Sequence, residues 1–512
     1  MQSALNKLAR RPEPTGGLLR ARRIGLHTQR EPVAIIRRDC PLCRSEGLAP
    51  RSQVLLRADR REVTAILFEG AEEWLERDEI GLSDAAWALL QGREGELVSI
   101  SHVPPLHSMQ SVRGRIYGKP IAAPAFDEII RDVVAGRYSD VQLSAFVTAG
   151  SSLPFDDEET YALTKAMVSA GEQLAWDEPV VVDKHSVGGL PGNRTSPIVV
   201  AIVAACGFVI PKTSSRAITS PAGTADAMET VTKVDLGPTL MRRVVAQEGG
   251  CLAWGGALNL SPADDIFIGV ERQLDVDPEG QLIASVLSKK IAAGASRIVL
   301  DVPVGPTAKV RSKESADRLT ARLTSIGARF GLEVRCLVSD GRQPVGRSVG
   351  PALEMMDVLA VLRGEPDAPA DLREHALRLS AAVIELAKGP GGPEALDIAR
   401  QTLEDGAALE KFERICLAQG GFREPSNAKL EHVITAARAG RVVGINNRAV
   451  AKLAKLAGAP DMPAAGLRMH VRLGDRIKAG DPLITLHADT RAELAYPLAY
   501  ADEVPDIISL ET

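Results

Sequence analysis

The sequence predicts an α/β protein with two main lobes, one helical and one built on a parallel sheet, and a small β-rich unit at each end. Residues from about 120 to 175 show helical periodicity, whereas from about 178 short buried strands alternate with helices, which implies a parallel sheet. The 512 residues give room for about three or four such units. Hydrophobic residues at 45% and charged residues at 25% are typical of a globular chain with a sizeable core.

The composition excludes several classes of protein. The longest apolar stretch, residues 197–210, is about 14 residues long, and a membrane-spanning helix needs roughly 20. The first residues lack the apolar segment of a secretory leader. The six cysteines are scattered along the chain, which suits a reducing compartment. We therefore expect a cytoplasmic protein without a membrane partner.

The charge is unevenly distributed, although the net charge of −5 gives no general reason to expect a nucleic-acid partner. Residues 1–61 carry 14 Lys and Arg against 5 Asp and Glu. A basic arm of this kind can bind RNA, but an Arg-rich surface on a small domain is the simpler interpretation. Cys40 and Cys43 form a CxxC pair without a second pair or histidines at ligand spacing, so a turn with two thiols is favoured over a metal or redox site.

Residues 1–100 are predicted to form the small N-terminal β-rich domain. Alternating apolar runs at 32–36 and 62–67 lie between glycines and prolines, which indicates strands. The stretch 71–90 is predicted to be a helix that closes this domain. Pro104 and Pro105 then mark a linker to the next domain.

Residues 104–175 are predicted to form a helical domain. Ile129 and Val133, four residues apart, lie on one apolar face of its first long helix. Residues 280–294 also read as helical and interrupt the α/β pattern around them. We therefore assign the segment 258–294 to the same helical domain, inserted back into it.

Residues 178–257 and 296–430 are predicted to form the α/β domain. Strand, helix, strand at this spacing implies parallel pairing with right-handed crossovers. The predicted strands are 180–182, 208–210, 298–302 and 334–338, and the predicted helices are 196–206 and 313–326.

Residues 431–512 are predicted to form a C-terminal β-rich unit of the α+β, β-hammerhead type. The segment 474–483 resembles half of a lipoyl-type module. Lys478 lacks the neighbours of a modified lysine, so we expect a structural unit without a covalently attached cofactor.

The sharpest candidate for chemistry is the segment 183–196, which follows a predicted strand and opens a predicted helix. Its glycines let the backbone approach a ligand closely, and the N–H groups at a helix start favour anions. Lys184 adds a positive charge, and Ser186, Thr195 and Ser196 add hydroxyl donors. The segment is not a Walker A loop, because no Gly-Lys-Ser/Thr ends it.

A second polar segment, 212–229, again follows a predicted strand and precedes a predicted helix. It is rich in small hydroxyl residues and contains Arg216. In open parallel sheets, ligands bind at the carboxyl ends of the strands. The two segments are therefore expected to face one pocket.

The two segments together carry a family resemblance. Lys-His-Ser-x-Gly-Gly, followed by Ser-Ser-Arg-Ala-Ile-Thr-Ser-Pro-Ala-Gly-Thr-Ala-Asp-x-Met-Glu, resembles the thymidine phosphorylase family of pentosyltransferases. The resemblance covers roughly residues 104–512 and is closer to the long branch that includes AMP phosphorylase, whose extra domain the N-terminal part also resembles.

The resemblance implies a two-lobed pentosyltransferase that cleaves a nucleoside N-glycosidic bond. Inorganic phosphate is the co-substrate, no cofactor or metal is implied, and the products are a free base and a sugar 1-phosphate. Thymidine is the name substrate, and a homodimer or higher homo-oligomer is expected. The implied phosphate-binding residues are Lys184, Ser186, Ser196, Ser214 and Thr224.

The resemblance also implies contacts to the nucleoside. Ser285 and Lys289 are base contacts that share a helix face. Asp277 is the implied proton donor to the leaving base, and His185 is the rival acid, since an unperturbed histidine titrates near neutrality. The other ligand contacts implied by the AMP phosphorylase branch are Gly189, Ser215, Arg216, Ala217, Ile218, Thr219, Ser220 and Lys309.

The sequence leaves four functions open. The short thymidine phosphorylases place an arginine on the pyrimidine; here that position falls near Val270, and Arg272 is displaced from it. The first candidate function is phosphorolysis of a nucleoside. The second is phosphorolysis of a nucleoside 5′-monophosphate, whose extra phosphate group would bind Arg216 and Lys309. A phosphoribosyltransferase would use Asp226 and Glu229 for magnesium, and a non-catalytic RNA-binding protein would use the basic arm. Closure of the lobes is expected at hinges near 172–179 and 293–297.

Overall fold

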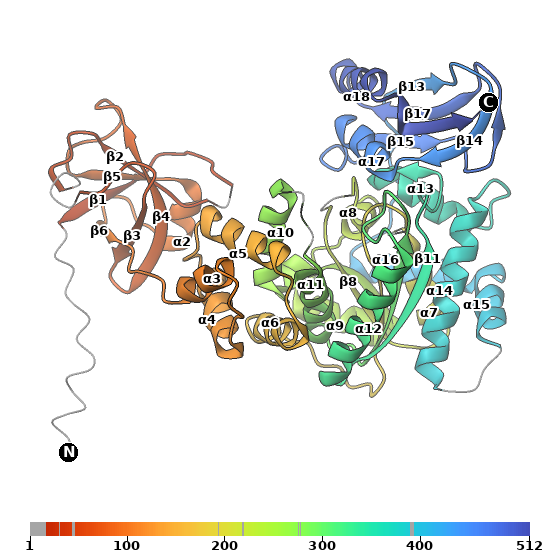
Figure 1. Cartoon of the computed structure of the whole chain (residues 1–512), viewed down its shortest axis with the longest axis horizontal. Helices are drawn as coiled ribbons and strands as arrows, with labels where there is room; N and C mark the ends of the chain where they lie inside the picture. Colours follow the sequence, from red (N-terminus) through yellow and green to blue (C-terminus); the bar gives the residue numbers. More distant parts are fainter. Residues whose placement is uncertain are drawn as a thin grey trace. The chain divides into compact units, whose positions relative to one another are not determined.

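The computed structural model describes residues 17–29, 31–42, 47–192, 194–217, 220–274, 276, 278–389 and 394–511. Its N-terminal part is a closed six-stranded barrel with the strand order β1-β5-β2-β4-β3-β6 (Figure 1). Apolar side chains from every strand fill the interior, among them Leu56, Leu67 and Ile100. The elements are β1 (Leu18–Arg23), β2 (Val33–Arg37), β3 (Gln53–Ala58), β4 (Arg61–Gly70), β5 (Glu79–Leu82), α2 (Asp84–Leu90) and β6 (Leu97–His102).

The predicted strands at 32–36 and 62–67 are confirmed, but the predicted helix over 71–90 is wrong for most of its length. Only Asp84–Leu90 is helical, begun by Ser83, whose side chain accepts a hydrogen bond from the backbone of Ala86. Glu79–Leu82 instead forms β5, which pairs in parallel with β1 and antiparallel with β2. Closure of the barrel requires this strand, so strand pairing overrides the local helical pattern.

The helical part comprises α3 (Ser108–Ile116), α4 (Ala123–Val134), α5 (Asp140–Ser152), α6 (Asp157–Ser169), α10 (Pro262–Leu274) and α11 (Glu279–Ala292). Helix α11 packs directly against α6, so a later segment of the chain joins an earlier one. Helix α6 begins with a capping box in which Asp156 and Glu159 each accept the other's backbone N–H. The stacked rings of Phe146 and Phe267, whose centroids are 5.2 Å apart, join α5 to α10.

The α/β part is built on five parallel strands. The strands β11-β10-β7 form one run and β8-β9 another, and a parallel bridge between Val181 and Val209 joins the two runs. The strands are β7 (Val182–Ser186), β8 (Ile210–Ser214), β9 (Gly250–Trp254), β10 (Arg297–Val304) and β11 (Glu333–Asp340). The helices are α7 (Thr195–Ala205), α8 (Thr224–Glu229), α9 (Pro238–Glu248), α12 (Lys313–Arg329), α13 (Pro351–Leu362), α14 (Ala370–Lys388), α15 (Ala395–Glu404) and α16 (Ala407–Gln419).

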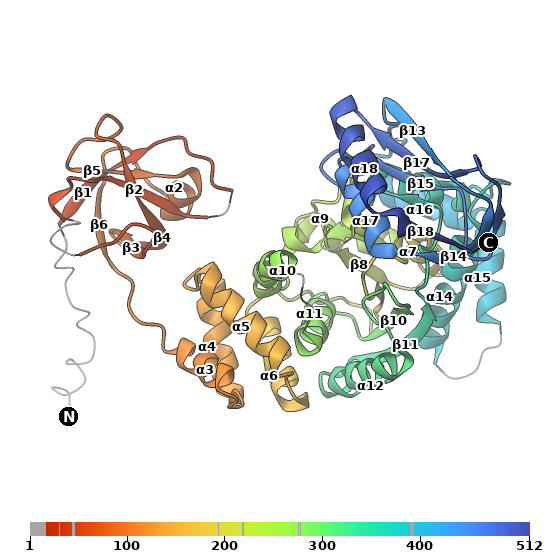
Figure 2. The same ribbon diagram turned by 45° about the horizontal axis from the view of Figure 1, so that its top comes forward.

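The sheet has helices on both faces. Side chains alternate along β10: Ile298, Leu300 and Val302 pack into a core with α11 and α12, whereas Val299 packs into a core with α7 and α14. Figure 2 shows α12 running beside β10 and β11. Because β7 and β10 pair in register, with Ser186 opposite Asp301, polar residues of the two strands share the face toward α7 and α14.

The two strands that carry the candidate motifs begin later than predicted. The prediction ended the strands at residues 182 and 210, whereas the structure has strands at Val182–Ser186 and Ile210–Ser214. The polar residues that follow the apolar runs therefore continue the strands instead of forming turns. The free-energy cost of burying these polar side chains is offset by their hydrogen bonds and ion pairs with residues far away in sequence. The local sequence does not show these partners.

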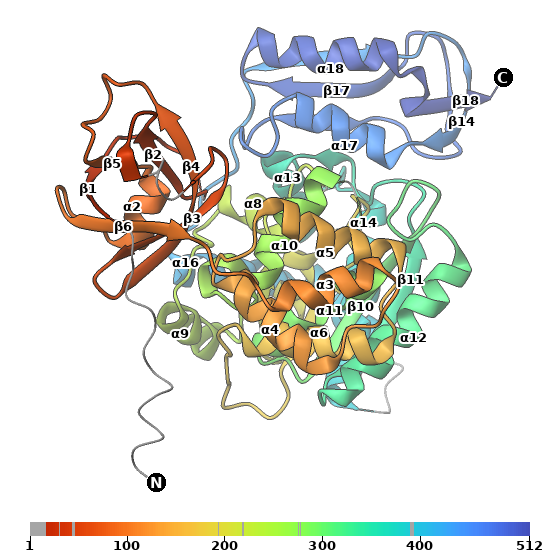
Figure 3. The ribbon, with the colours of Figure 1, turned by 60° about the vertical axis from the view of Figure 1, so that its left-hand side comes forward.

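The C-terminal part is α+β. A four-stranded sheet has the order β12-β15-β17-β13, a three-stranded sheet has the order β16-β14-β18, and α17 and α18 lie side by side (Figure 3). The side chain of Asn447 donates to the carbonyl of Gly341 over 2.8 Å, which fixes the start of α17 beside the α/β part. The elements are β12 (Ser348–Val349), β13 (Leu430–Thr435), β14 (Gly440–Ile445), α17 (Asn447–Leu456), β15 (Gly466–Met469), β16 (Arg476–Ile477), β17 (Pro482–Ala488), α18 (Arg491–Glu503) and β18 (Ile508–Glu511).

Within the described ranges, no helix combines the length and the apolar character that crossing a membrane requires. The same ranges contain no group of three or more His, Cys, Asp or Glu side chains placed to hold a metal ion. Cys40 is buried in the barrel, and Cys43, its partner in the CxxC pair, lies outside the described residues.

Candidate active site

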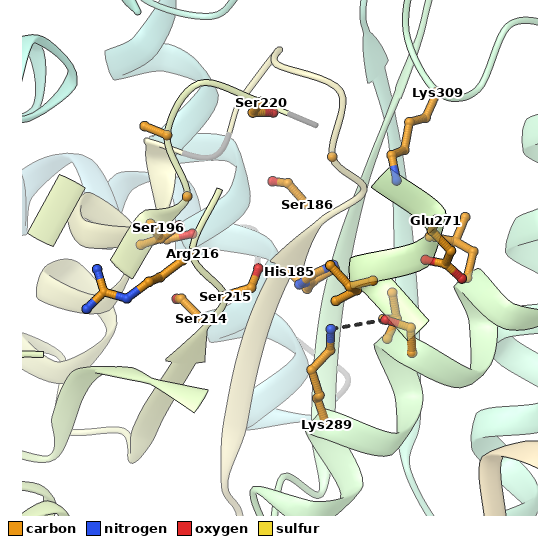
Figure 4. A pocket seen from close by; sticks show the side chains of 18 of the residues that line it. His185, Ser186, Ser196, Ser214, Ser215, Arg216, Ser220, Glu271, Lys289 and Lys309 are labelled. Atoms are coloured by element: carbon orange, nitrogen blue, oxygen red, sulfur yellow. Dashed lines mark hydrogen bonds between the residues drawn. The ribbon is translucent and has the colours of Figure 1, made fainter. Parts of the chain in front are cut away.

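A cavity of about 100 Å³ lies at the carboxyl ends of β7 and β8, between the α/β sheet and helices α10 and α11 (Figure 4). Strands of an open parallel sheet present their following loops at this edge, where ligands bind. The lining residues are His185, Ser186, Gly188, Ser196, Lys212, Ser214, Ser215, Arg216, Ser220, Ala222, Gly223, Thr224, Ile268, Glu271, Pro278, Leu282, Ser285, Val286, Lys289 and Lys309.

The first motif forms a cradle of hydroxyl groups around the ammonium group of Lys184. The side chain of Lys184 is fully buried and donates to Ser186 Oγ and Thr195 Oγ1, each over 2.6 Å, and to Ser196 Oγ over 3.3 Å. Burial lowers the pKa of Lys184 to about 8, although the nearby carboxylates of Asp301 and Asp183 oppose this. A buried ammonium held by hydroxyls is suited to an anion.

Two further buried lysines, Lys212 and Lys290, add positive charge to the same region. Lys290 forms an ion pair with Asp183 at 2.7 Å, and Lys212 lies 3.9 Å from the same carboxylate. Both ammonium groups donate to the carbonyl of Thr213. Burial and then the charge of Lys290 hold the pKa of Lys212 well below its ordinary value.

Sequence reasoning missed Lys212, Lys290 and Glu271 as residues of this region. Lys212 and Glu271 line the cavity, and Lys290 lies behind it. The signal for Lys212 was present, since a lysine directly after a buried strand resembles Lys184 in its own motif. Glu271 lies beside the position from which the short phosphorylases' arginine is missing, but its neighbours in sequence gave no sign of a role.

The second motif supplies hydroxyl groups from the next strand. Ser214 Oγ is buried at the cavity wall and has no hydrogen-bond partner among the described residues. A buried hydroxyl at a cavity wall is available to hydrogen-bond a group that enters the cavity. Ser220 Oγ accepts a hydrogen bond from the backbone of Leu190 over 3.1 Å, which ties the second loop to the first.

Thr224 and Ser215 also line the cavity, as the resemblance implies. Ala217 lies at the edge of a neighbouring cavity of about 690 Å³. Its backbone N–H donates to Asp226 over 2.6 Å. Ile218 and Thr219 lie outside the described residues.

Arg216 lies at the cavity, but carboxylates already engage its charge. Its guanidinium binds Glu229 at 2.5 and 2.9 Å and Asp226 at 3.2 Å, and it lies 4.7 Å from the ring centre of Trp254. Figure 4 shows the guanidinium pointing away from His185. The proposed extra anion site at Arg216 is therefore not supported by this geometry. The same ion pairs occupy Asp226 and Glu229, the pair considered for magnesium.

The opposite wall of the cavity comes from α11. Lys289 Nζ donates to Ser285 Oγ over 3.0 Å (the dashed line that starts at Lys289 in Figure 4) and to Asp264 Oδ2 over 2.7 Å. The two predicted base contacts are thus brought together, as their spacing of four residues predicts. Figure 4 shows the ammonium group of Lys289 on the side of the cavity near His185.

The surroundings of His185 favour its neutral form. Burial, followed by the charges of Lys290 and Lys212, keeps the pKa of His185 well below its ordinary value. A neutral imidazole can donate an N–H hydrogen bond, but it holds no extra proton near pH 7. Asp277, the other proposed acid, lies outside the described residues, whereas the adjacent Pro278 lines the cavity.

A second, more basic cavity of about 330 Å³ adjoins the first, and Lys309 lines both. Gly189 has φ +105°, and a Cβ atom there would lie 3.1 Å from Lys309 Cγ, so this position requires glycine. The cavity is lined by Gly189, Leu190, Arg272, Thr307, Ala308, Lys309, Asn447, Arg448, Ala451, Lys452 and Lys455. Five of these residues are basic, and none of the described lining residues is acidic.

The chain matches three family models in succession. Residues 113–171 match the helical bundle domain of a glycosyl transferase family, residues 178–409 match its α/β domain, and residues 441–504 match the pyrimidine nucleoside phosphorylase C-terminal domain. The fold and the site together define a pentosyltransferase enzyme.

Relatives of similar length identify the family. The chain is 58% identical to a putative thymidine phosphorylase of Chelativorans sp. (strain BNC1), over 96% of this chain and 97% of the relative. It is 55% identical to a putative thymidine phosphorylase of Tolumonas auensis, over 98% of this chain and all of the relative. The chain belongs to the thymidine phosphorylase family.

Solved structures extend the likeness in fold alone. The anthranilate phosphoribosyltransferase of Thermus thermophilus has a TM-score of 0.50 at 21% identity and covers 60% of this chain and 99% of its own. The Saccharomyces cerevisiae enzyme has a TM-score of 0.51 at 15% identity, over 61% of this chain and 97% of its own. Both likenesses agree with a helical lobe joined to an α/β lobe.

Proposed function

We propose that this enzyme catalyses phosphorolysis of a nucleoside, with inorganic phosphate as co-substrate and no other cofactor. The reaction that gives the family its name is thymidine + phosphate = thymine + 2-deoxy-α-D-ribose 1-phosphate. The observation that carries the proposal is the cradle around Lys184 beside Ser214, whose buried hydroxyl lacks a partner among the described residues. A small anion bound there would face the cavity wall that carries Ser285 and Lys289.

The geometry suits a displacement without a covalent enzyme intermediate. An oxygen of phosphate forms the new bond to C1′ while the N-glycosidic bond breaks, and the electron pair leaves with the base nitrogen, which gains a proton. Hydroxyls and buried ammonium groups hold the anion in place, and positioning of this kind lowers the barrier. The sugar carbon carries positive charge in the transition state, as in glycoside hydrolysis.

The leaving base is proposed to contact Ser285, Lys289 and His185. Lys289 and the neutral ring of His185 can donate hydrogen bonds to base oxygens or nitrogens as negative charge develops on them. Asp277 stays the proposed source of the proton. The pKa of His185 favours Asp277 in this role, since His185 carries no extra proton near pH 7.

Substrate binding is proposed to need an opening of the cavity. Its volume of about 100 Å³ is smaller than the roughly 300–1,000 Å³ typical of sites for small organic ligands. It accommodates phosphate, whereas a whole nucleoside requires more space. Rotation at the predicted hinges near 172–179 and 293–297 would supply it.

A second candidate substrate is a nucleoside 5′-monophosphate, giving adenine and ribose 1,5-bisphosphate when the substrate is AMP. The adjoining cavity favours it, because Lys309, Arg272, Arg448 and Lys452 all line it beside the site. A phosphate group on the sugar would find these cations there, instead of at Arg216. Charge complementarity of this kind gives specificity.

The test is the release of free base from thymidine, uridine, cytidine and AMP, each with and without inorganic phosphate. Phosphate-dependent release from any of them supports phosphorolysis, and a much higher kcat/KM for AMP selects the second candidate. Lys452→Gln should then weaken AMP turnover and leave thymidine unchanged, whereas Lys478→Gln, at an exposed position of the C-terminal part, should change neither. Activity that needs magnesium and pyrophosphate instead would overturn both candidates.

A further inference from the structure

We propose that Asp301 is a positioning residue of the phosphate cradle, which acts through Ser186 and Lys184 and is itself held by His375 and Ser339. The proposal rests on the proposed function of the cradle. Asp301 does not line the cavity, and it is not among the residues that the family resemblance implies. Its role follows from the hydrogen bonds around it.

The carboxylate of Asp301 is completely buried and bound on both oxygens. Ser186 Oγ donates to Oδ2 over 3.0 Å, and Ser339 Oγ donates to Oδ1 over 2.6 Å. His375 Nε2 lies 3.0 Å from Oδ2. An ionised carboxylate only accepts, so His375 Nε2 must carry the hydrogen of this bond. Asp301 on β10 thereby joins two strands, β7 and β11, and one helix, α14.

The count of hydrogens fixes the orientation of the cradle. Ser186 has one hydroxyl hydrogen and gives it to Asp301, so a lone pair of Ser186 accepts from Lys184. Thr195 gives its hydrogen to the carbonyl of Gly192 over 2.6 Å and likewise accepts from Lys184. Ser196 also accepts from Lys184, so its own hydroxyl hydrogen can be donated to a ligand in the cavity that Ser196 lines. Without Asp301, the hydroxyl hydrogen of Ser186 would lose its acceptor, and only the bond from Lys184 would remain to orient Ser186.

Asp301 also supports the charge of Lys184. Burial lowers the pKa of Lys184 to about 8; Asp301 opposes this most strongly, Asp183 opposes it next, and Lys290 adds to the lowering. Burial alone would raise the pKa of Asp301, but the bond from His375 and the charge of Lys184 hold it below its ordinary value, so Asp301 is ionised. The titratable groups around Lys184 are Asp301 on β10, Asp183 and His185 on β7, Lys212 on β8, Lys290 on α11 and, beyond Asp301, His375 on α14.

The support of Asp301 is accessible to substitution without changing the catalytic cavity. His375 and Ser339 line a different cavity, of about 760 Å³, between β11 and α14. Neither residue lines the cavity that holds Ser186 and Lys289. A change in phosphate binding on replacing His375 is therefore expected to pass through Asp301, with which its imidazole shares a hydrogen bond.

The experiment measures the Kd of inorganic phosphate by calorimetry and the KM values for phosphate and nucleoside, near pH 6.5 and near pH 8. Asp301→Asn should weaken phosphate binding about tenfold or more near pH 8, because Lys184 then loses its proton, and by less near pH 6.5. The nucleoside KM should change less than the phosphate KM. His375→Gln should give the same pattern, more weakly. Glu248→Gln, which alters a buried carboxylate paired with Lys411 and Arg414, is the matched control and should change neither constant.

A double-mutant cycle with Ser186→Ala separates positioning from general support of the fold. If Asp301 acts through Ser186, the two replacements together should weaken phosphate binding by less than the product of their separate effects. Equal weakening at both pH values, full additivity, or an equal effect of Glu248→Gln would overturn the proposal. If Asp301→Asn does not fold, His375→Gln and Ser339→Ala carry the same test. Calorimetry needs no turnover, so a protein that binds phosphate in this pattern but releases no base would refute the proposed function alone.

Discussion

Replacing Lys184 by methionine should abolish most phosphate affinity while leaving the fold nearly as stable. An ammonium about 4 Å from one phosphate charge contributes about 4 kcal/mol at an effective dielectric constant of about 20. Because hydroxyls stand around Lys184 and share its contact with the anion, we take about 2–4 kcal/mol. This corresponds to a Kd for phosphate about 30- to 1,000-fold weaker.

The expected change in stability is small because two effects oppose each other. A pKa near 8, against 10.5 for an exposed lysine, means that keeping the buried amine charged costs about 3 kcal/mol near pH 7. Methionine removes this cost. It also leaves the hydroxyls of Ser186, Thr195 and Ser196 without their donor, at about 1 kcal/mol each. The unfolding temperature should therefore change by only about a few degrees.

Calorimetric titration with phosphate and a thermal melt of the same sample are the assays. Lys411→Met, which removes a part-buried lysine that is paired with Glu248 outside the cradle, is the matched control and should bind phosphate normally. Unchanged phosphate affinity in Lys184→Met would refute the reasoning. So would an affinity loss that appears only alongside unfolding.

Three other outcomes are expected. Phosphate affinity should be highest below about pH 8 and fall up to about tenfold per pH unit above it, because the ammonium form of Lys184 binds the anion. Between pH 8 and 10.5 the native protein releases this proton before the unfolded chain does, so the contribution of Lys184 to stability rises there and unfolding cannot explain the loss of affinity. A flat calorimetric profile from about pH 7 to 9.5 would contradict this prediction. Lys289→Gln should raise the nucleoside KM about tenfold or more, because a charged donor is lost, and should leave the phosphate Kd unchanged. Steady-state rates over a matrix of both substrate concentrations test this, and a larger effect on phosphate than on the nucleoside would contradict it. Gly189→Ala should destabilise the fold by about 1–3 kcal/mol, since φ is +105° and the new methyl group meets Lys309, whereas an unchanged denaturant midpoint would show that this backbone is relaxed.

The fold could be predicted where local pattern and tertiary structure agree. Alternating buried strands and helices after residue 178 predicted the parallel sheet, and the helix of residues 280–294 predicted the segment that returns to α6. The stretch 71–90 failed because Glu79–Leu82 takes its conformation from β1 and β2, which lie far away in sequence. Pairing across the barrel is a non-local property that local helical spacing cannot reveal.

The motif residues could be placed at one sheet edge, but their partners could not be predicted. Lys184, Ser186 and Ser196 share a cradle because of their order around one strand and one helix, which the sequence displays. Asp301 and His375 come from segments more than 100 residues later, and nothing near them in sequence marks them as buried partners of the cradle. Arg216 lines the cavity as the resemblance implies, but its ion pairs with Glu229 and Asp226 could not be predicted from the local sequence.

The location of the chain and its assembly into a homodimer or higher oligomer stay predictions, as does the role of the basic N-terminal arm. RNA binding by that arm would show a steep dependence on salt concentration. Gel filtration with light scattering would measure the oligomeric state directly.

The most direct test of the central claim follows the oxygen atoms. The enzyme is incubated with a nucleoside and ¹⁸O-labelled phosphate, and the sugar product is analysed by mass spectrometry after the phosphate is cleaved off at the P–O bond. Attack by phosphate held in the cradle predicts sugar 1-phosphate whose C1′ oxygen carries the label. Free sugar bearing unlabelled solvent oxygen would show that water is the nucleophile, and the proposed role of the cradle would be wrong.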